Sequence, residues 1–145
     1  MNRPPPYFLD TCIPIYAAGR EHPYRQPCVQ LVLAVAEGEI EAATDVEVIQ
    51  EIVYRFHAIR RRPDGLKLAE DFLSLMENVL PVVRQDVARS LELQRAYPFL
   101  PPRDALHVAV MLGAGLEQIV SADRHFDRVK EVQRLDPASV QWRER

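Results

Sequence analysis

Acidic and hydroxyl-bearing side chains come directly after three short apolar segments of this sequence. They are Asp10-Thr11, Thr44-Asp45 and Ser121-Ala122-Asp123. Two more acids, Glu51 and Asp104, lie within apolar segments that have the spacing of helices. Carboxylates that converge on one place raise one another's pKa, and a divalent cation such as Mg²⁺ or Mn²⁺ relieves the repulsion through the oxygen ligands that it prefers. Such a cation can activate a water and neutralise a phosphoryl transition state, so these residues predict hydrolysis of a phosphodiester.

Each of these acids also has a simpler explanation when it is considered alone. Asp10 could cap the helix that follows it, and Asp104 could stabilise a helix N-terminus through the helix dipole. Glu51 could be a solvated helix residue, and Asp123 could be a turn former. The prediction of a metal site therefore depends on the acids acting together.

Other catalytic chemistries find little support in the sequence. The four histidines lack HExxH spacing, and the two cysteines lack the spacing of zinc ligands or of a disulfide framework. No Gly-rich phosphate loop is present, and no serine lies in a GxSxG motif. Oxygen ligands are therefore the metal-binding set that the sequence favours.

The apolar periodicity predicts short strands that alternate with helices. Strands are expected over Tyr7–Leu9, Ile40–Thr44, Val79–Val82, Gln118–Val120 and Val132–Leu135. Helices are expected from Pro14 onward and over Gln26–Glu37, Val46–Arg60, Leu66–Met76, Gln85–Ala96, Arg103–Leu112 and Arg124–Val129. This order favours an α/β fold with a parallel sheet covered on both faces, in which ligands bind beyond the carboxyl ends of the strands.

Three local features refine this prediction. The run from Arg60 to Gly65 predicts a break between two helices, and Pro81 favours an edge position for its strand. Glu51 lies about 60° outside the apolar arc of its helix, so it can face solvent or a cleft. The run Arg60-Arg61-Arg62 is the strongest basic patch, and either RNA contact or a solvated helix end would explain it.

Length and charge set the limits of these interpretations. The chain has 145 residues, which corresponds to one domain over residues 1–145. Its 21 acids against 18 bases give a formal charge of −3, which argues against a protein that coats nucleic acid through bulk positive charge. The bases are 16 Arg and 2 Lys, and Arg is the better fork for phosphate.

The sequence also carries signals about the ends of the chain and its compartment. Residues 1–6 form a Pro-rich N-terminal extension, and residues 137–145 form a polar tail in which Trp142 is expected to be mobile or to dock on a partner. The start lacks a basic-then-apolar leader, and no apolar run approaches the ~18–20 residues needed to cross a bilayer. Together with the absence of a disulfide framework, this predicts a reducing, cytoplasmic setting without a membrane partner.

Four segments, taken in order, resemble one known family. They are Tyr7-Phe8-Leu9-Asp10-Thr11, Val48-Ile49-Gln50-Glu51-Ile52, Arg103-Asp104-Ala105-Leu106-His107-Val108-Ala109, and Ile119-Val120-Ser121-Ala122-Asp123 with Phe126 after it. Their order and spacing resemble a PIN domain, and in particular the toxin ribonucleases of VapBC-type toxin–antitoxin pairs. The resemblance extends from about Tyr7 to Leu135, which is most of the chain.

The resemblance implies a three-layer α/β/α sandwich around a parallel sheet of four or five strands. It implies Mg²⁺- or Mn²⁺-dependent cleavage of RNA by a catalytic, metal-binding quartet of acids. Carried over by position, the quartet is Asp10, Glu51, Asp104 and Asp123, with Thr11 and Ser121 as polar neighbours and Asp127 as an auxiliary acid. It also implies a homodimer and a cognate antitoxin whose C-terminal segment lies in the active-site groove.

Two departures and two rival hypotheses accompany this resemblance. Cys12 stands two residues after the first Asp, where the family often has Asn or Ser, and several residues precede the first strand. A non-catalytic PIN fold that binds RNA or a protein is one rival. An aspartyl phosphatase with Asp10 as nucleophile is the other, but the second Asp at i+2 and a lysine at a strand end are both missing.

Overall fold

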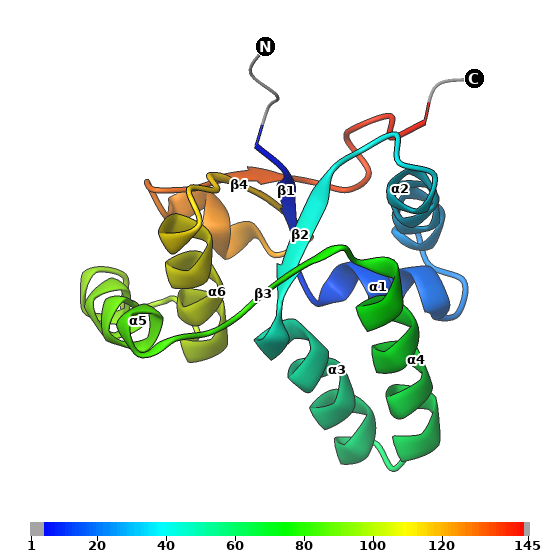
Figure 1. Cartoon of the computed structure of the whole chain (residues 1–145), viewed down its shortest axis with the longest axis horizontal. Coiled ribbons are helices and arrows are strands. Elements are labelled where there is room, and N and C mark those ends of the chain that lie inside the picture. Colours follow the sequence, from blue (N-terminus) through cyan, green and yellow to red (C-terminus); the bar gives the residue numbers. More distant parts are fainter. Residues whose placement is uncertain (1–4, 144–145) are drawn as a thin grey trace.

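A computed structural model describes residues 5–143 of the chain. It has a five-stranded parallel sheet with strand order β3-β2-β1-β4-β5 (Figure 1). In chain order the elements are β1 (Tyr7–Leu9), α1 (Cys12–Ala18), α2 (Arg25–Ala36), β2 (Ala42–Asp45), α3 (Val46–Ala58), α4 (Arg62–Leu75), β3 (Asn78–Leu80), α5 (Arg84–Ala96), α6 (Pro102–Gly113), β4 (Gln118–Val120), the 3₁₀ helix η1 (Arg124–Arg128) and β5 (Gln133–Leu135). The predicted α/β/α architecture with a parallel sheet is confirmed.

The central strands carry buried apolar residues, because helices cover both faces of the sheet. Phe8 and Ile119 pair between β1 and β4, and both are fully buried. Ala42 and Ala43 supply small buried residues on β2. The predicted edge position of the strand near Pro81 is confirmed, because β3 lies at one end of the strand order.

The helices pack in sequential pairs around this sheet. The pairs are α1 with α2, α3 with α4, and α5 with α6. Figure 1 shows α5 and α6 on one side of the sheet and α1, α2 and α4 on the other. Each pair shields apolar side chains of the central strands, so the carboxyl ends of those strands are left as the place where polar groups can gather.

Later strands are added on both sides of β1, the central strand of the sheet. From β1 the chain adds β2 and then β3 on one side, whereas β4 and β5 are added on the other side. The connections after β1 and β4 therefore diverge, which opens a crevice beyond the carboxyl ends of these two strands. Asp10 and Ser121 are the first residues after β1 and β4, so both lie at this crevice.

The predicted break over Arg60–Gly65 is wrong in its length. Helix α4 begins at Arg62, and only Ile59 to Arg61 separate it from α3. Arg60 makes the turn with a φ of 61°, and Pro63 is tolerated because it lies in the first turn of α4. Gly65 allows close helix contact, since a Cβ there would lie 2.4 Å from the Cβ of Phe56.

The other boundaries differ from the predictions by a few residues. The second strand begins at Ala42 rather than Ile40, whose backbone N–H instead donates to the carbonyl of Ala34 at the end of α2. The predicted helix near Arg124 is a 3₁₀ helix. None of the helices among residues 5–143 is long and apolar enough to span a membrane.

The prediction that Trp142 is mobile or docks on a partner is wrong. Its side chain is buried in this chain's own core, with its ring edge-on to Tyr7 at 5.8 Å between centroids. Its Nε1 donates to the carbonyl of Pro137 at 2.8 Å. Residues 1–4 of the predicted extension and residues 144–145 of the predicted tail lie outside the described residues.

Candidate metal centre

Asp10 is anchored at the crevice from two sides. The backbone N–H of Thr11 donates to Asp10 Oδ1 at 2.8 Å, and the hydroxyl of Ser121 donates to Oδ2 at 2.6 Å. Asp10 and Ser121 are both buried, so these bonds are shielded from water. The predicted neighbours Thr11 and Ser121 thus contact the first acid directly and fix its carboxylate between β1 and β4.

Two further acids and two histidines converge beside Asp10. Ligand-type atoms of Asp10, Asp104 and His107 lie within 4.8 Å of one another, and so do those of Asp104, Asp123 and His125. Asp104 belongs to both groups, because the first turn of α6 brings it between the ends of β1 and β4. We call Asp10, Asp104 and Asp123 the acid cluster; their carboxylates and the adjacent histidines could hold a metal ion.

The electrostatics of the acid cluster fit a missing positive charge. Burial, followed by the negative charge of Asp10, raises the pKa of Asp104 to about 7. Burial also raises the pKa of Asp10, although the charge of His107 and the bonds from Ser121 and Thr11 oppose this. Oxygen ligands that repel one another in this way are the donor set that Mg²⁺ or Mn²⁺ would suit.

Glu51 is buried on α3, and its carboxylate is directed to other partners. The Thr11 hydroxyl donates to Glu51 Oε1 at 3.0 Å, and Arg55 pairs with Oε2 at 2.5 Å. Burial alone would raise the pKa of Glu51, but the His107 hydrogen bond and the Arg55 charge lower it to about 2. Glu51 belongs to neither group of potential metal ligands, yet it lines one pocket of about 440 Å³ with Asp104 and Asp123.

His107 connects Glu51 to another buried acid, Asp45. Its Nδ1 lies 2.8 Å from Asp45 Oδ2 and its Nε2 lies 3.4 Å from Glu51 Oε1. The ring is fully buried; burial alone would lower its pKa, but the hydrogen bonds to both carboxylates raise it well above 6.5. We call this arrangement the Asp45–His107–Glu51 chain: a buried cation held between two anions.

The contact between Asp45 and His107 was not predicted, although Asp45 was expected at the end of a strand. His107 lies three residues after Asp104 in a buried helix, so both residues fall on the same helix face. That spacing was the available signal. Asp45 Oδ1 also accepts from the backbone N–H of Val48 at 2.8 Å, so its second oxygen is turned to His107 while the first caps α3.

Asp127 lies apart from both groups of potential ligands. It is exposed and forms a bidentate pair with Arg134, at 2.9 Å from Nε to Oδ1 and 3.1 Å from Nη2 to Oδ2. Arg134 Nη1 also donates to the carbonyl of Ser121 at 3.0 Å. Asp127 therefore reaches the crevice only through Arg134.

Cys12 contributes a buried neutral thiol, since burial raises its pKa well above 9.0.

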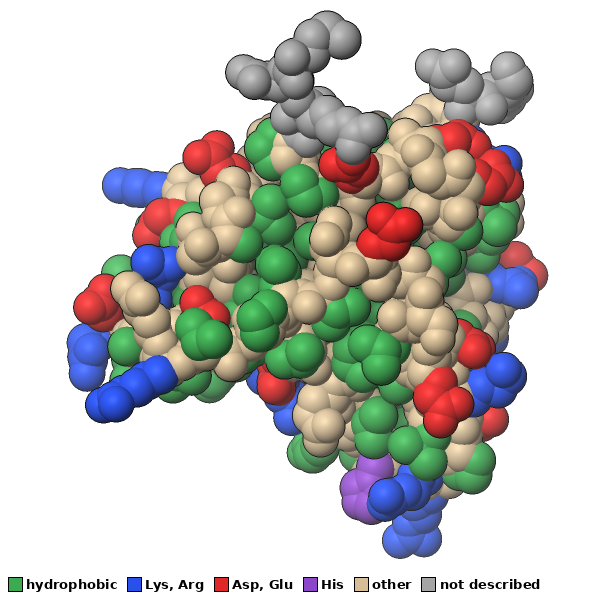
Figure 2. All heavy atoms as spheres, in the orientation of Figure 1, with side chains coloured by type: hydrophobic (Ala, Val, Ile, Leu, Met, Phe, Trp, Pro, Cys, Tyr) green, Lys and Arg blue, Asp and Glu red, His purple; other side chains and the backbone are tan. Residues whose placement is uncertain are grey.

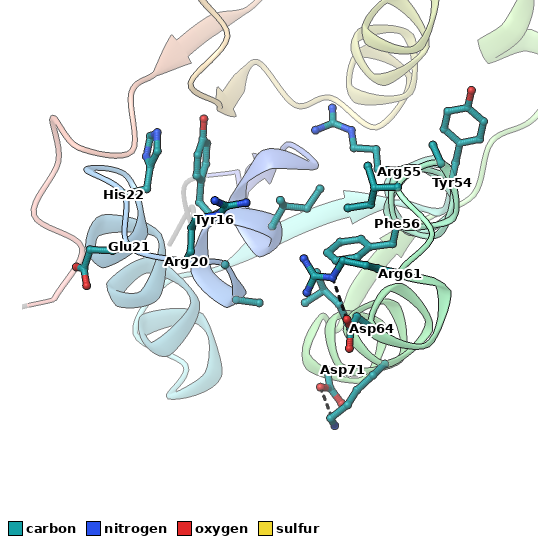
Figure 3. A pocket seen from close by; sticks show the side chains of 17 residues that line it. Tyr16, Arg20, Glu21, His22, Tyr54, Arg55, Phe56, Arg61, Asp64 and Asp71 are labelled. Carbon is teal, nitrogen blue, oxygen red and sulfur yellow. Dashed lines mark hydrogen bonds and ion pairs between the residues drawn. The ribbon is translucent and has the colours of Figure 1, made fainter.

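A groove of about 890 Å³ runs beside the acid pocket, between the end of α1 and the α3–α4 pair (Figure 3). Figure 3 shows Tyr16 and His22 on one wall and Arg55, Phe56 and Arg61 on the other. Arg55 lines both the groove and the pocket that holds Asp104. The groove therefore leads directly to the acid cluster.

The basic run at the α3–α4 junction lies at the far end of this helix pair. Figure 2 shows Lys and Arg side chains gathered where α3 and α4 are joined. Arg61 is already engaged there, because its Nε donates to Asp64 Oδ2 at 3.0 Å and its guanidinium lies 5.3 Å from the ring centroid of Phe56. A surface ion pair of this kind favours a solvated helix end.

Comparison with known proteins gives a consistent set of relatives. Residues 7–132 match the PIN domain family. The chain is 35% identical over 127 residues to "Ribonuclease VapC13" of Mycobacterium tuberculosis, and the match covers 88% of this chain and 97% of that protein. It is 37% identical over 130 residues to "Ribonuclease VapC7" of the same organism, and that match covers 89% of this chain and 90% of the relative.

A solved structure shares the fold at lower sequence identity. It is the VapBC2 complex from Rickettsia felis bound to a DNA fragment from their promoter, with a TM-score of 0.69 and 17% identity. The match covers 89% of this chain and 96% of the other. Similarity at this level supports the three-layer fold described above.

Proposed function

The chain belongs to the PIN domain family, and from this membership we propose that it is the toxin ribonuclease of a toxin–antitoxin pair. Two relatives that are at least 35% identical over nearly their whole length are named ribonucleases. The observation that carries the proposal is the convergence of Asp10, Asp104 and Asp123 at the crevice between β1 and β4. RNA is the substrate that this assignment gives.

The acid cluster would hold Mg²⁺ or Mn²⁺, with Glu51 as the fourth carboxylate on the wall of the same pocket. When bound, such a cation activates water and neutralises negative charge at the phosphoryl group. Asp10 is held ready for this role by Ser121 and Thr11. Asp104 would gain from a cation, because its pKa is raised to about 7 without one.

The Asp45–His107–Glu51 chain would position the remaining parts of the site. His107 fixes Glu51 on α3 relative to Asp104 on the same helix as itself. Thr11 bonds Glu51 through its hydroxyl and Asp10 through its backbone N–H, so it ties the two acids together. These contacts would keep the pocket in shape while the RNA phosphate enters it.

A cognate antitoxin is the protein partner that follows from the family. We place its C-terminal segment in the groove of Figure 3, because this groove leads to the acid cluster and Arg55 lines both. A homodimer and a cytoplasmic setting complete the proposal. Exposed apolar residues that recur every fourth position from the N-cap of α5 (Val83, Val87 and Leu91) support association through protein contacts, and light scattering of the purified chain would measure it.

RNA cleavage tests the proposed function. The wild-type chain should cleave a mixed-sequence single-stranded RNA in Mn²⁺ or Mg²⁺ and stop in EDTA, and Asp10→Asn should abolish cleavage while circular dichroism stays unchanged. Glu92→Gln is the matched control, because Glu92 is an exposed acid on α5. Cleavage that persists in EDTA or in Asp10→Asn would overturn the proposal.

The rival of a non-catalytic binding module predicts a different outcome. Such a module would bind RNA or a protein without turnover and would lack a functional cation site. Calorimetric titration with Mn²⁺ separates the two, since the ribonuclease requires binding that depends on Asp104. Absence of Mn²⁺ binding together with absence of cleavage would favour the binding module.

A further inference from the structure

His125 directs its Nε2 at the acid cluster, where the atom contacts Asp104 without forming a hydrogen bond. Its Nε2 is buried and makes no hydrogen bond with any of the residues 5–143. The atom lies 2.8 Å from Asp104 Oδ2, but the contact lacks the alignment of a hydrogen bond. A buried polar atom that makes no hydrogen bond is costly in an ordinary protein interior, and a cation between Nε2 and the Asp104 carboxylate would satisfy both groups.

The position of Nε2 suits a ligand that the carboxylates would share. A ring nitrogen of His125 and oxygens of Asp104 and Asp123 all lie within 4.8 Å of one another, and Nε2 is the nitrogen that contacts Asp104. Ligand atoms of one octahedral ion are about 3–4 Å apart, because each lies about 2.1 Å from the ion. A modest side-chain adjustment would therefore bring these three atoms around a single cation.

The local chain holds the imidazole in this place. His125 is in the 3₁₀ helix η1, two residues after Asp123, and its ring centroid lies 4.5 Å from that of Phe126. Phe126 is fully buried, so it anchors the turn that carries His125. The ring is thus supported by the core and does not depend on a contact with solvent.

The other histidine near the acids is not available in the same way. Both ring nitrogens of His107 already face carboxylate oxygens of Asp45 and Glu51. A metal ion at His107 would have to break one of these buried contacts. His125 is therefore the imidazole that can offer a free nitrogen to the acid cluster.

We propose that His125 is a nitrogen ligand of the cation at the acid cluster, so that the site binds a transition ion such as Mn²⁺ in preference to Mg²⁺. The proposal rests on the proposed function, since it assumes that the acid cluster holds a cation. Carboxylates serve Mg²⁺ and Mn²⁺ alike, whereas an imidazole favours first-row transition ions. Replacing His125 by Gln should accordingly weaken Mn²⁺ binding by at least about tenfold and change Mg²⁺ binding little.

Electron spin-echo modulation of Mn²⁺ bound to the full chain detects the nitrogen directly. Protein labelled with ¹⁵N-histidine should show ¹⁵N coupling to Mn²⁺, and His125→Gln should lose it. His57→Gln is the matched control, because His57 is exposed near the end of α3. Calorimetry on the same samples gives the Mn²⁺ and Mg²⁺ dissociation constants.

Three outcomes distinguish the possibilities. Bound Mn²⁺ without histidine coupling in the wild type overturns the proposal and leaves the ribonuclease assignment standing, a result that needs no variant to fold. Coupling that persists in His125→Gln assigns the nitrogen to another histidine and also overturns it. No Mn²⁺ binding at all in the wild type would instead contradict the metal site of the proposed function.

Discussion

Two neighbouring sets of acids in this protein differ in how their charge is balanced. In the Asp45–His107–Glu51 chain both carboxylates face the His107 ring, and the pKa of Glu51 is lowered to about 2, where burial alone would raise it. In the acid cluster the carboxylates face one another, and burial and repulsion raise the pKa of Asp104 to about 7. Glu51 and Asp104 nevertheless line the same pocket.

The difference assigns distinct tasks to the two sets. A set of charges that the protein neutralises internally can be rigid and needs no ligand. A set that is left with excess negative charge is destabilising until a cation arrives, so it is poised to bind one. We therefore propose that the cation is held by Asp10, Asp104 and Asp123, with the Asp45–His107–Glu51 chain supporting the wall behind it.

The largest expected effect comes from removing a charge in the acid cluster. Asp104→Asn should reduce RNA cleavage at least about 10³-fold, because a bound cation contributes several kcal/mol to the transition state. Initial rates at saturating Mn²⁺ measure this, with Glu92→Gln as the control. An Asp104→Asn protein that retains a tenth of the activity would place the cation elsewhere.

Removing the cation of the Asp45–His107–Glu51 chain, in contrast, should mainly lower the stability of the protein. His107→Leu leaves two buried carboxylates without their shared cation, so the free energy of unfolding should fall by about 3–5 kcal/mol. Urea denaturation of the metal-free protein measures it, and His57→Leu gives the baseline for an exposed histidine. If both variants unfold at the same urea concentration, His107 is not the cation that balances this chain.

The acid cluster should make the stability of the metal-free protein depend on pH. The pKa of Asp104 is about 7 in the folded protein against 3.8 ordinarily, so the folded state holds its proton more tightly and stability falls as the pH rises through this window. Between pH 5 and pH 8 the loss should be about 2–3 kcal/mol in the wild type relative to Asp104→Asn. Urea unfolding at the two pH values measures it.

The metal completes this pH test. Saturating Mn²⁺ should remove most of the loss at pH 8 in the wild type, since the cation neutralises the repelling carboxylates. Equal pH dependence of the wild type and Asp104→Asn would contradict the view that Asp104 carries uncompensated charge.

The smallest expected effect is at the exposed edge of the Asp45–His107–Glu51 chain. Arg55 pairs with Glu51 but is half exposed, so Arg55→Ala should cost only about 0.5–1 kcal/mol of stability. The pKa of Glu51, followed by carboxyl ¹³C chemical shift, should rise because one of its cationic neighbours is gone. An unchanged Glu51 pKa would mean that His107 and Thr11 suffice to hold it low.

The sequence predicted the convergence of acids because topology alone determines it. Asp10 and Asp123 follow strands that are adjacent in a parallel sheet, and Asp104 begins a buried helix, so strand order and helix packing bring them together. The division of the acids into two sets could not be predicted. It depends on which way the Glu51 carboxylate turns and on the contact between His107 and Asp45, which are 62 residues apart.

The wrong predictions about the fold came from contacts that the local sequence pattern does not show. Pro63 and Gly65 carry the local pattern of a break, but Pro63 lies in the first turn of α4 and Gly65 packs against Phe56 of α3. Trp142 lies in a polar stretch, and only the packing of Tyr7 from the other end of the chain makes it part of the core. Distant contacts of this kind leave no periodic pattern.

Calorimetric titration of the full chain with Mn²⁺ tests the central claim most directly. The account predicts that the wild type and Glu92→Gln bind Mn²⁺ alike, whereas Asp104→Asn loses binding while its circular dichroism is unchanged. Wild-type affinity in Asp104→Asn would contradict the assignment of the cation to Asp10, Asp104 and Asp123.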